Sequence, residues 1–133
     1  MDKIRLEPRL YRIFEDHREM YQQFKKLLVA CAQGEGLHTM GGLFKHIQGH
    51  MEPHFQLEES LMHPDYAETA AHKQAHLALR QDFAHLVQEF EHTGATHQMM
   101  GKLTLFTLQW LVEHEQGLDH PLEKHLVEHS LEN

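Results

Sequence analysis

Apolar residues recur at three- and four-residue intervals along almost the whole of this 133-residue chain. That spacing is typical of amphipathic α-helices, and few runs show the alternation or β-branched enrichment of strands. Glycine and proline interrupt the pattern and divide it into four long segments and a short one. We therefore predict an all-α fold: an up-down-up-down four-helix bundle with a short C-terminal helix, an architecture whose core can hold metal ions.

The predicted helices have recognisable ends. They run from Pro8 to the break at Gly34 and Gly36, from about Leu37 to Met62 before His63 and Pro64, from about Ala67 to His92, from about Thr96 to Gln116, and from Pro121 onward. Gly117 is the predicted terminator of the fourth helix. Pro53 lies inside the second helix and predicts a kink just before His54.

Helical spacing also predicts which side chains point inward. We expect His17 to share an inward face with Phe14 and Tyr21, three and four residues away. The predicted inner face of the fourth helix comprises Leu103, Phe106, Leu108, Trp110, Leu111 and His114.

Length and charge narrow the class of protein. A chain with 41% hydrophobic residues suits one domain, residues 1–133. The net charge of -8, with no dense Lys/Arg cluster, argues against nucleic-acid and anionic-membrane partners. No signal peptide or membrane-spanning run is evident, so we expect a cytoplasmic location. Cys31 is the only cysteine, which leaves histidine and carboxylate to carry any metal.

Imidazole and carboxylate side chains form an ordered series along the four helices. Residues four apart on a helix are neighbours on one face, so His54 with Glu58, and His72 with His76, make chelating pairs. Five neutral imidazoles with two carboxylates suit borderline first-row metals such as iron. The predicted ligands of this two-metal centre are His17, His54, Glu58, His72, His76, His114 and Asp119.

The last two members of the series are five residues apart. A regular α-helix places such residues roughly 140° apart around its axis. If the helix ends at Gly117, however, Asp119 lies on the turning chain and can swing back toward His114.

Histidine is so abundant here that single motifs carry little weight. The chain has 15 histidines, and pairs such as His46/His50 and His50/His54 fit solvated surface positions equally well. The whole constellation is stronger evidence, because its members lie in apolar stripes where unpaired polar groups would be costly to bury.

Order, spacing and hydrophobic context together resemble the hemerythrin family over nearly the whole chain. The residues that carry the resemblance are His17, the segment His54-Phe-Gln-Leu-Glu58-Glu59, the segment His72-Lys-Gln-Ala-His76, and Trp110-Leu-Val-Glu-His114 with Asp119. The resemblance implies that His72, His76 and His114 hold one iron, and that His17 and His54 hold the other. It also implies bridging by Glu58, Asp119 and an oxo or hydroxo group, with dioxygen binding at the iron that has two histidines.

Three features depart from the family pattern. Glu115 stands where an apolar residue usually lines the oxygen pocket; it can occupy the open iron position, donate a proton or admit water, or it can turn to solvent. The stretch before His17 differs from the usual approach to the first ligand. Pro53 can shift the helix register so that His50 competes with His54. Trp110 fits either core packing or a wall of the oxygen pocket.

The sequence fits two functional classes, and a third is a further possibility. The first is a dioxygen-binding protein for oxygen storage, transport or sensing, which needs no turnover. The second is a di-iron redox enzyme or peroxide scavenger in which Glu115 acts at the oxygen position. The third is an iron-sensing module whose folding depends on metal. A monomer and a homo-oligomer are both compatible with the sequence.

Overall fold

The computed structural model describes residues 8–62 and 65–132, and every regular element in these ranges is helical. The elements in chain order are α1 (Pro8–Ala32), α2 (Leu37–Leu61), α3 (Thr69–Thr93), α4 (His97–Leu108), the π-helix η1 (Gln109–Asp119) and α5 (His120–Glu132). The all-α prediction is confirmed. The first three predicted helices differ from the observed ones only at their ends, and His63 and Pro64 lie outside the described residues.

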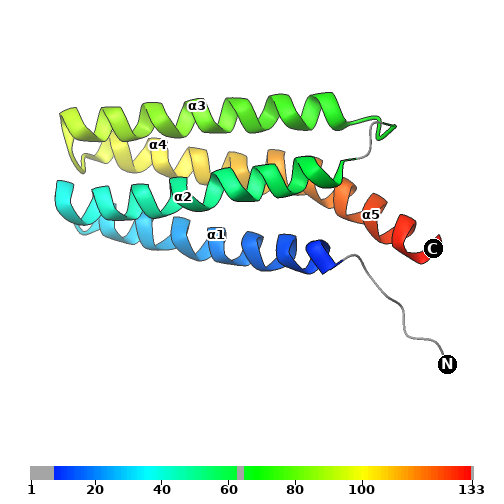
Figure 1. The fold of residues 1–133 in the computed structure, drawn as a ribbon. Coiled ribbons are helices and arrows are strands. Elements are labelled where there is room, and N and C mark those ends of the chain that lie inside the picture. The colour runs from blue at the N-terminus through cyan, green and yellow to red at the C-terminus, as the bar shows by residue number, and fades with distance from the viewer. Residues whose placement is uncertain (1–7, 63–64, 133) are drawn as a thin grey trace.

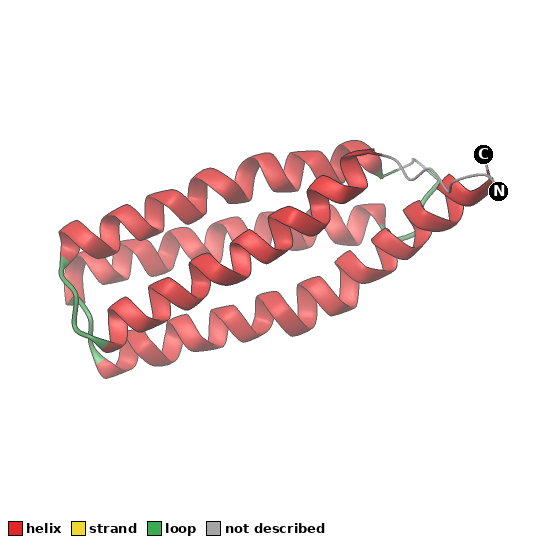
Figure 2. Ribbon diagram, turned by 90° about the horizontal axis from the view of Figure 1, so that it is seen from below, coloured by secondary structure: helices red, strands yellow, loops and turns green. Residues whose placement is uncertain are grey.

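Consecutive long helices lie side by side (Figure 1). The α1–α2 and α3–α4 connections lie at one end of the bundle, whereas the end of α2 and the start of α3 lie at the other (Figures 1 and 2). Helix α1 packs against both α2 and α4, and α3 does the same. The four rods therefore enclose a common interior. Within the described ranges, no helix is long and apolar enough to cross a bilayer.

Glycine and threonine account for the two tight turns at the first end. Gly34 and Gly94 have φ values of +73° and +74°, a left-handed conformation that costs other residues energy. Thr96 caps α4, because its hydroxyl accepts a hydrogen bond of 3.0 Å from the Met99 amide. These residues explain why the chain reverses where the sequence predicts breaks.

The apolar core fills the half of the bundle nearest these turns. Its large aromatic side chains pack edge to face with ring centroids 5.3–5.9 Å apart at Phe24/Trp110, Phe44/Phe83, Phe44/Phe90 and Phe24/Phe106. Each buried phenylalanine contributes roughly 1.5–3 kcal/mol. On every helix the candidate ligands lie on the other side of these residues, toward the opposite end.

Two predicted inner faces are partly wrong. Phe14 and Tyr21 are 41% and 51% exposed, although His17 between them is buried. The buried face of α1 instead includes Ile13 and Met20, because apolar residues surround more than one side of this helix and spacing alone does not choose between them. Leu108, predicted to face inward from α4, is exposed as well.

The prediction that Gly117 ends the fourth helix is also wrong. The chain passes through Gly117 as part of η1 and continues directly into α5. A π-helix bonds each amide to the carbonyl five residues back, as the His120 amide does to the Glu115 carbonyl. Residues five apart therefore lie on roughly the same side of the helix, which brings His114 and Asp119 together without a break in the helix.

Candidate metal centre

All seven residues of the predicted ligand series meet in the interior of the bundle. They come from α1, α2, α3 and η1, and each is buried. The side chains form two groups that could each hold a metal ion, and the two groups share Glu58 and Asp119. The shared carboxylates lie between the groups, which is the position that bridging ligands require.

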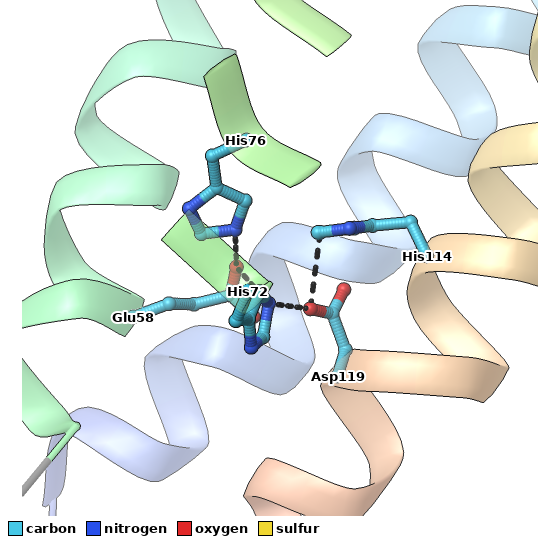
Figure 3. Close-up of side chains that lie close together, drawn as sticks. All are labelled: Glu58, His72, His76, His114 and Asp119. Carbon is cyan, nitrogen blue, oxygen red and sulfur yellow. Dashed lines mark hydrogen bonds and ion pairs between the residues drawn. The ribbon is translucent and has the colours of Figure 1, made fainter. Parts of the chain in front are cut away.

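The first group joins three imidazoles to the two carboxylates (Figure 3). His72 Nε2 and His114 Nε2 lie 2.7 Å and 3.1 Å from Asp119 Oδ1. His76 Nε2 lies 3.1 Å from Glu58 Oε1. Three imidazole nitrogens, from α3 and η1, thus surround the oxygens of Glu58 and Asp119.

The second group adds two imidazoles from α1 and α2. His17 Nε2 lies 3.1 Å from Asp119 Oδ2 and 3.5 Å from Glu58 Oε2. His54 Nε2 lies 3.4 Å from Glu58 Oε1. Asp119 therefore turns one oxygen toward His72 and His114 and its other oxygen toward His17.

Three carboxylates hold the outer nitrogens of the imidazoles. His17 Nδ1 lies 3.0 Å from Glu123 Oε1, His54 Nδ1 lies 3.3 Å from Asp16 Oδ2, and His76 Nδ1 lies 2.9 Å from Glu59 Oε2. Such partners fix the ring orientation and tautomer of metal-binding histidines and raise their basicity. They leave each Nε2 aimed at Glu58 and Asp119.

The sequence reasoning assigned none of these three partners. Glu123 follows Asp119 by four residues, a spacing that could have placed it on the same helical face. Asp16 and Glu59 are sequence neighbours of ligands but contact histidines on other helices. Their role depends on how the helices pack, which spacing within one helix does not reveal.

Several buried polar atoms at the centre lie close to one another but make no hydrogen bond of acceptable geometry within the part of the chain that the structure describes. They include His17 Nε2, His54 Nε2, His114 Nε2, Glu58 Oε2 and Asp119 Oδ2. An unsatisfied buried polar atom costs about 1–3 kcal/mol, and native proteins contain few. These five atoms belong to residues of the two groups, so the donor set fits metal ions of the iron or zinc type.

The charges at the centre are strongly perturbed. Burial opposes protonation of His17, but the Asp119, Glu123 and Glu58 carboxylates outweigh it and raise the pKa of His17 to about 12. Burial, together with positive charge on His114 and His72, lowers the pKa of His76 to about 2. Burial also raises the pKa of Glu58 well above its usual value. Cations placed between the groups would offset the clustered carboxylate charge in place of these protons.

Aromatic rings separate the centre from the apolar core. Phe55 stacks on His76 with 4.0 Å between ring centroids, and Trp110 lies 5.5 Å from both Phe55 and His114. Trp110 is therefore a core residue that also contacts the candidate centre, which confirms the core-packing interpretation; its role as a wall of an oxygen pocket stays a prediction.

Glu115 lies beside the centre rather than inside it. Its Oε1 atom is 3.9 Å from His17 Nδ1, the nitrogen that faces away from Glu58 and Asp119. Burial raises the pKa of this partly exposed carboxyl. With Tyr21, Leu111 and other residues it lines a surface groove of about 380 Å³ that reaches His17.

Pro53 does not bring His50 into the centre. Helix α2 continues through Pro53, and His54 is the α2 histidine that faces Glu58. His50 belongs to a different group of side chains, with Glu19 and His46. The alternative register is therefore not adopted.

Comparison with known proteins gives one family. The family described as "Hemerythrin HHE cation binding domain" matches residues 9–129. The comparisons with curated proteins and with solved structures returned no match.

Proposed function

This chain belongs to the hemerythrin family of HHE cation-binding domains, and from that premise we propose that it is a non-haem di-iron protein that binds dioxygen reversibly. Oxygen storage, transport and sensing all require this property and no turnover. The main support for this proposal is the pair of buried groups of candidate ligands. They share two carboxylates, and one has three imidazoles and the other has two.

The proposed ligands follow from this division. His72, His76 and His114 would hold one iron, and His17 and His54 would hold the other. Glu58 and Asp119 would bridge them, since each presents oxygens to imidazoles of both groups. The iron pair would supply the electrons and the open coordination position that dioxygen needs.

The smaller number of imidazoles in the second group supports binding of a small ligand there, because fewer protein donors leave more of the metal open. The groove beside His17 supports access from the same side. The buried rings of Phe55 and Trp110 instead pack against His76 and His114 of the three-histidine group. A groove that reaches His17, together with apolar rings around the remaining imidazoles, favours entry of a small neutral molecule.

The remaining residues would hold the ligands in place. Asp16, Glu59 and Glu123 lie within 3.3 Å of the outer nitrogens of His54, His76 and His17 and so would keep each Nε2 turned inward, where a metal ion would replace any proton on it. This arrangement binds metal only with neutral imidazoles, so acid should compete with the metal.

A second candidate function is a di-iron redox enzyme or peroxide scavenger. The observation that favours it is Glu115, a carboxyl with a raised pKa in the groove that reaches His17. A protonated carboxyl there can deliver a proton toward the centre, which reductive chemistry needs and reversible binding does not.

One experiment separates these functions. Iron-loaded, anaerobically reduced protein is exposed to oxygen while its visible spectrum is recorded, and iron is counted per chain. Two irons with a charge-transfer band that disappears under vacuum and returns with oxygen would support the carrier or sensor. Two irons that pass directly to a stable ferric spectrum, with repeated turnover when reductant is added, would support the enzyme. Failure to load two irons would refute both.

A further inference from the structure

A third group of metal-ligating side chains lies outside the candidate centre, between α1 and α2. It consists of Glu19, His46 and His50, and one ligand atom of each lies within 4.8 Å of the others. His46 Nε2 is 3.8 Å from Glu19 Oε1, and the His46 and His50 ring centroids are 4.7 Å apart. No other group of this kind occurs among residues 9–62 and 65–128, whose side chains the structure describes, apart from the two at the centre.

The three side chains are arranged so that they could chelate one metal ion. His46 and His50 are four residues apart on α2 and therefore project from one face. Glu19 faces them from α1, the helix that packs most extensively on α2. The buried Gln23 side chain donates a hydrogen bond of 2.9 Å to Glu19 Oε1, which holds the carboxylate in position. Three ligands from two tightly packed helices are thus fixed near one point.

We propose that Glu19, His46 and His50 form a second, surface site for a divalent first-row transition ion, with zinc as the reference metal. Two imidazoles and one carboxylate match the protein ligands of open zinc sites, in which water fills the remaining position. The hard ions calcium and magnesium prefer shells made of oxygen and are disfavoured here. This site goes beyond the di-iron function and shares no residue with its ligands.

The exposure of the group fits an exchangeable site. His46 and Glu19 side chains are 49% and 40% exposed, so a metal bound there keeps contact with water. Metal–ligand distances of about 2.0–2.2 Å require the three side chains to close slightly on the ion. The exposed His46 side chain has the rotamer freedom to do so. The site would therefore bind more weakly than the buried centre and release its ion more readily.

The test is a calorimetric titration of the iron-loaded protein with Zn²⁺, with iron counted before and after. The expected result is one zinc ion bound per chain with no loss of iron. The double variant His46→Gln/His50→Gln should lose this binding. Glu19→Gln, which keeps the size of the side chain but removes its charge, should weaken it by at least about tenfold.

The matched control is His85→Gln/His92→Gln, which also removes two exposed imidazoles, here from α3. It should bind zinc as the unmodified protein does. Equal zinc binding by the His46/His50 variant, an unchanged affinity in Glu19→Gln, or release of iron during the titration would each overturn the proposed site.

Discussion

His114 Nε2 lies 3.1 Å from Asp119 Oδ1, although these residues are five positions apart in one uninterrupted helical rod. An α-helix would turn them away from each other, and the π-helical segment η1 turns them to the same side. The helix therefore delivers two candidate ligands at a spacing that looks unsuitable in sequence.

The glycine inside this segment gives a direct test of the continuous helix. A Cβ atom added at Gly117 would lie 3.8 Å from the Val112 carbonyl oxygen, an ordinary contact, and its φ is not left-handed. Gly117→Ala should therefore raise the free energy of unfolding by about 0.5–1 kcal/mol in urea titrations, with iron content unchanged. Gly94→Ala is the control: there φ is +74°, and a loss of about 1–2 kcal/mol is expected. Equal losses in both variants would mean that the helix ends at Gly117.

Removal of a shared carboxylate should abolish the centre. Glu58 is fully buried and contacts imidazoles of both groups, so Glu58→Ala should reduce iron from two ions to less than one per chain. His76→Ala should also lower the iron content. Glu52→Ala, which changes an exposed carboxylate on the same helix, should have no effect on iron. Elemental analysis of purified protein measures all three, and full loading of both centre variants would refute the ligand assignment.

Loss of an outer partner should affect one metal more than the other. Glu123 contacts His17 only at the outer nitrogen, so Glu123→Leu should weaken the two-histidine iron by about ten- to a hundredfold and leave the three-histidine iron bound. Chelator titration followed by iron counting should then show a stable content of one ion per chain. Simultaneous loss of both irons would contradict a role specific to His17.

Substitution of Glu115 should change the oxygen chemistry and leave the metal content unchanged, because its carboxyl lies in the groove and faces the outer side of His17. Glu115→Ile should retain two irons, and it should slow autoxidation because an apolar side chain reduces water beside the centre. Stopped-flow spectra of the reduced protein mixed with oxygen measure that rate. An unchanged rate would remove Glu115 from the chemistry, and loss of one iron would make it a ligand.

The metal-free protein should lose stability in acid through His76. Its pKa is about 2 in the folded state and about 6.5 when unfolded, so between these values the unfolded chain binds one more proton. Above pH 6.5 this residue leaves the free energy of unfolding unchanged. Below pH 6.5 it lowers that free energy by up to about 1.4 kcal/mol for each pH unit. Urea titrations with chelator at pH 4–7 should show a steeper loss for the unmodified protein than for His76→Gln. Parallel pH profiles would refute the shifted pKa.

Much of the fold and of the grouping of the candidate ligands follows from the sequence, because both depend on spacing within single helices. The pairs His54/Glu58 and His72/His76 needed only the helical repeat to be placed on common faces. The contact between Asp119 and His114 depends on the hydrogen-bond pattern of η1, and no distinctive side chain in the sequence marks that pattern. Partners such as Asp16 and Glu59 needed the packing of one helix on another. The inward face of α1 was misassigned for a further reason, since Phe14 and Tyr21 offer as large an apolar surface as Ile13 and Met20, which are buried in their place.

The π-helical segment also changes the phase of everything that follows it. An α-helix advances about 100° per residue, whereas each residue of η1 turns the chain by less, so α5 emerges rotated relative to the rod that preceded it. A helical wheel drawn continuously from α4 would assign α5 the wrong inner face. In the structure the rotation buries Leu122 and brings Glu123 to His17. Insertion or deletion of a single residue anywhere in η1 would thus act at a distance, by turning α5 as a whole away from the first helix.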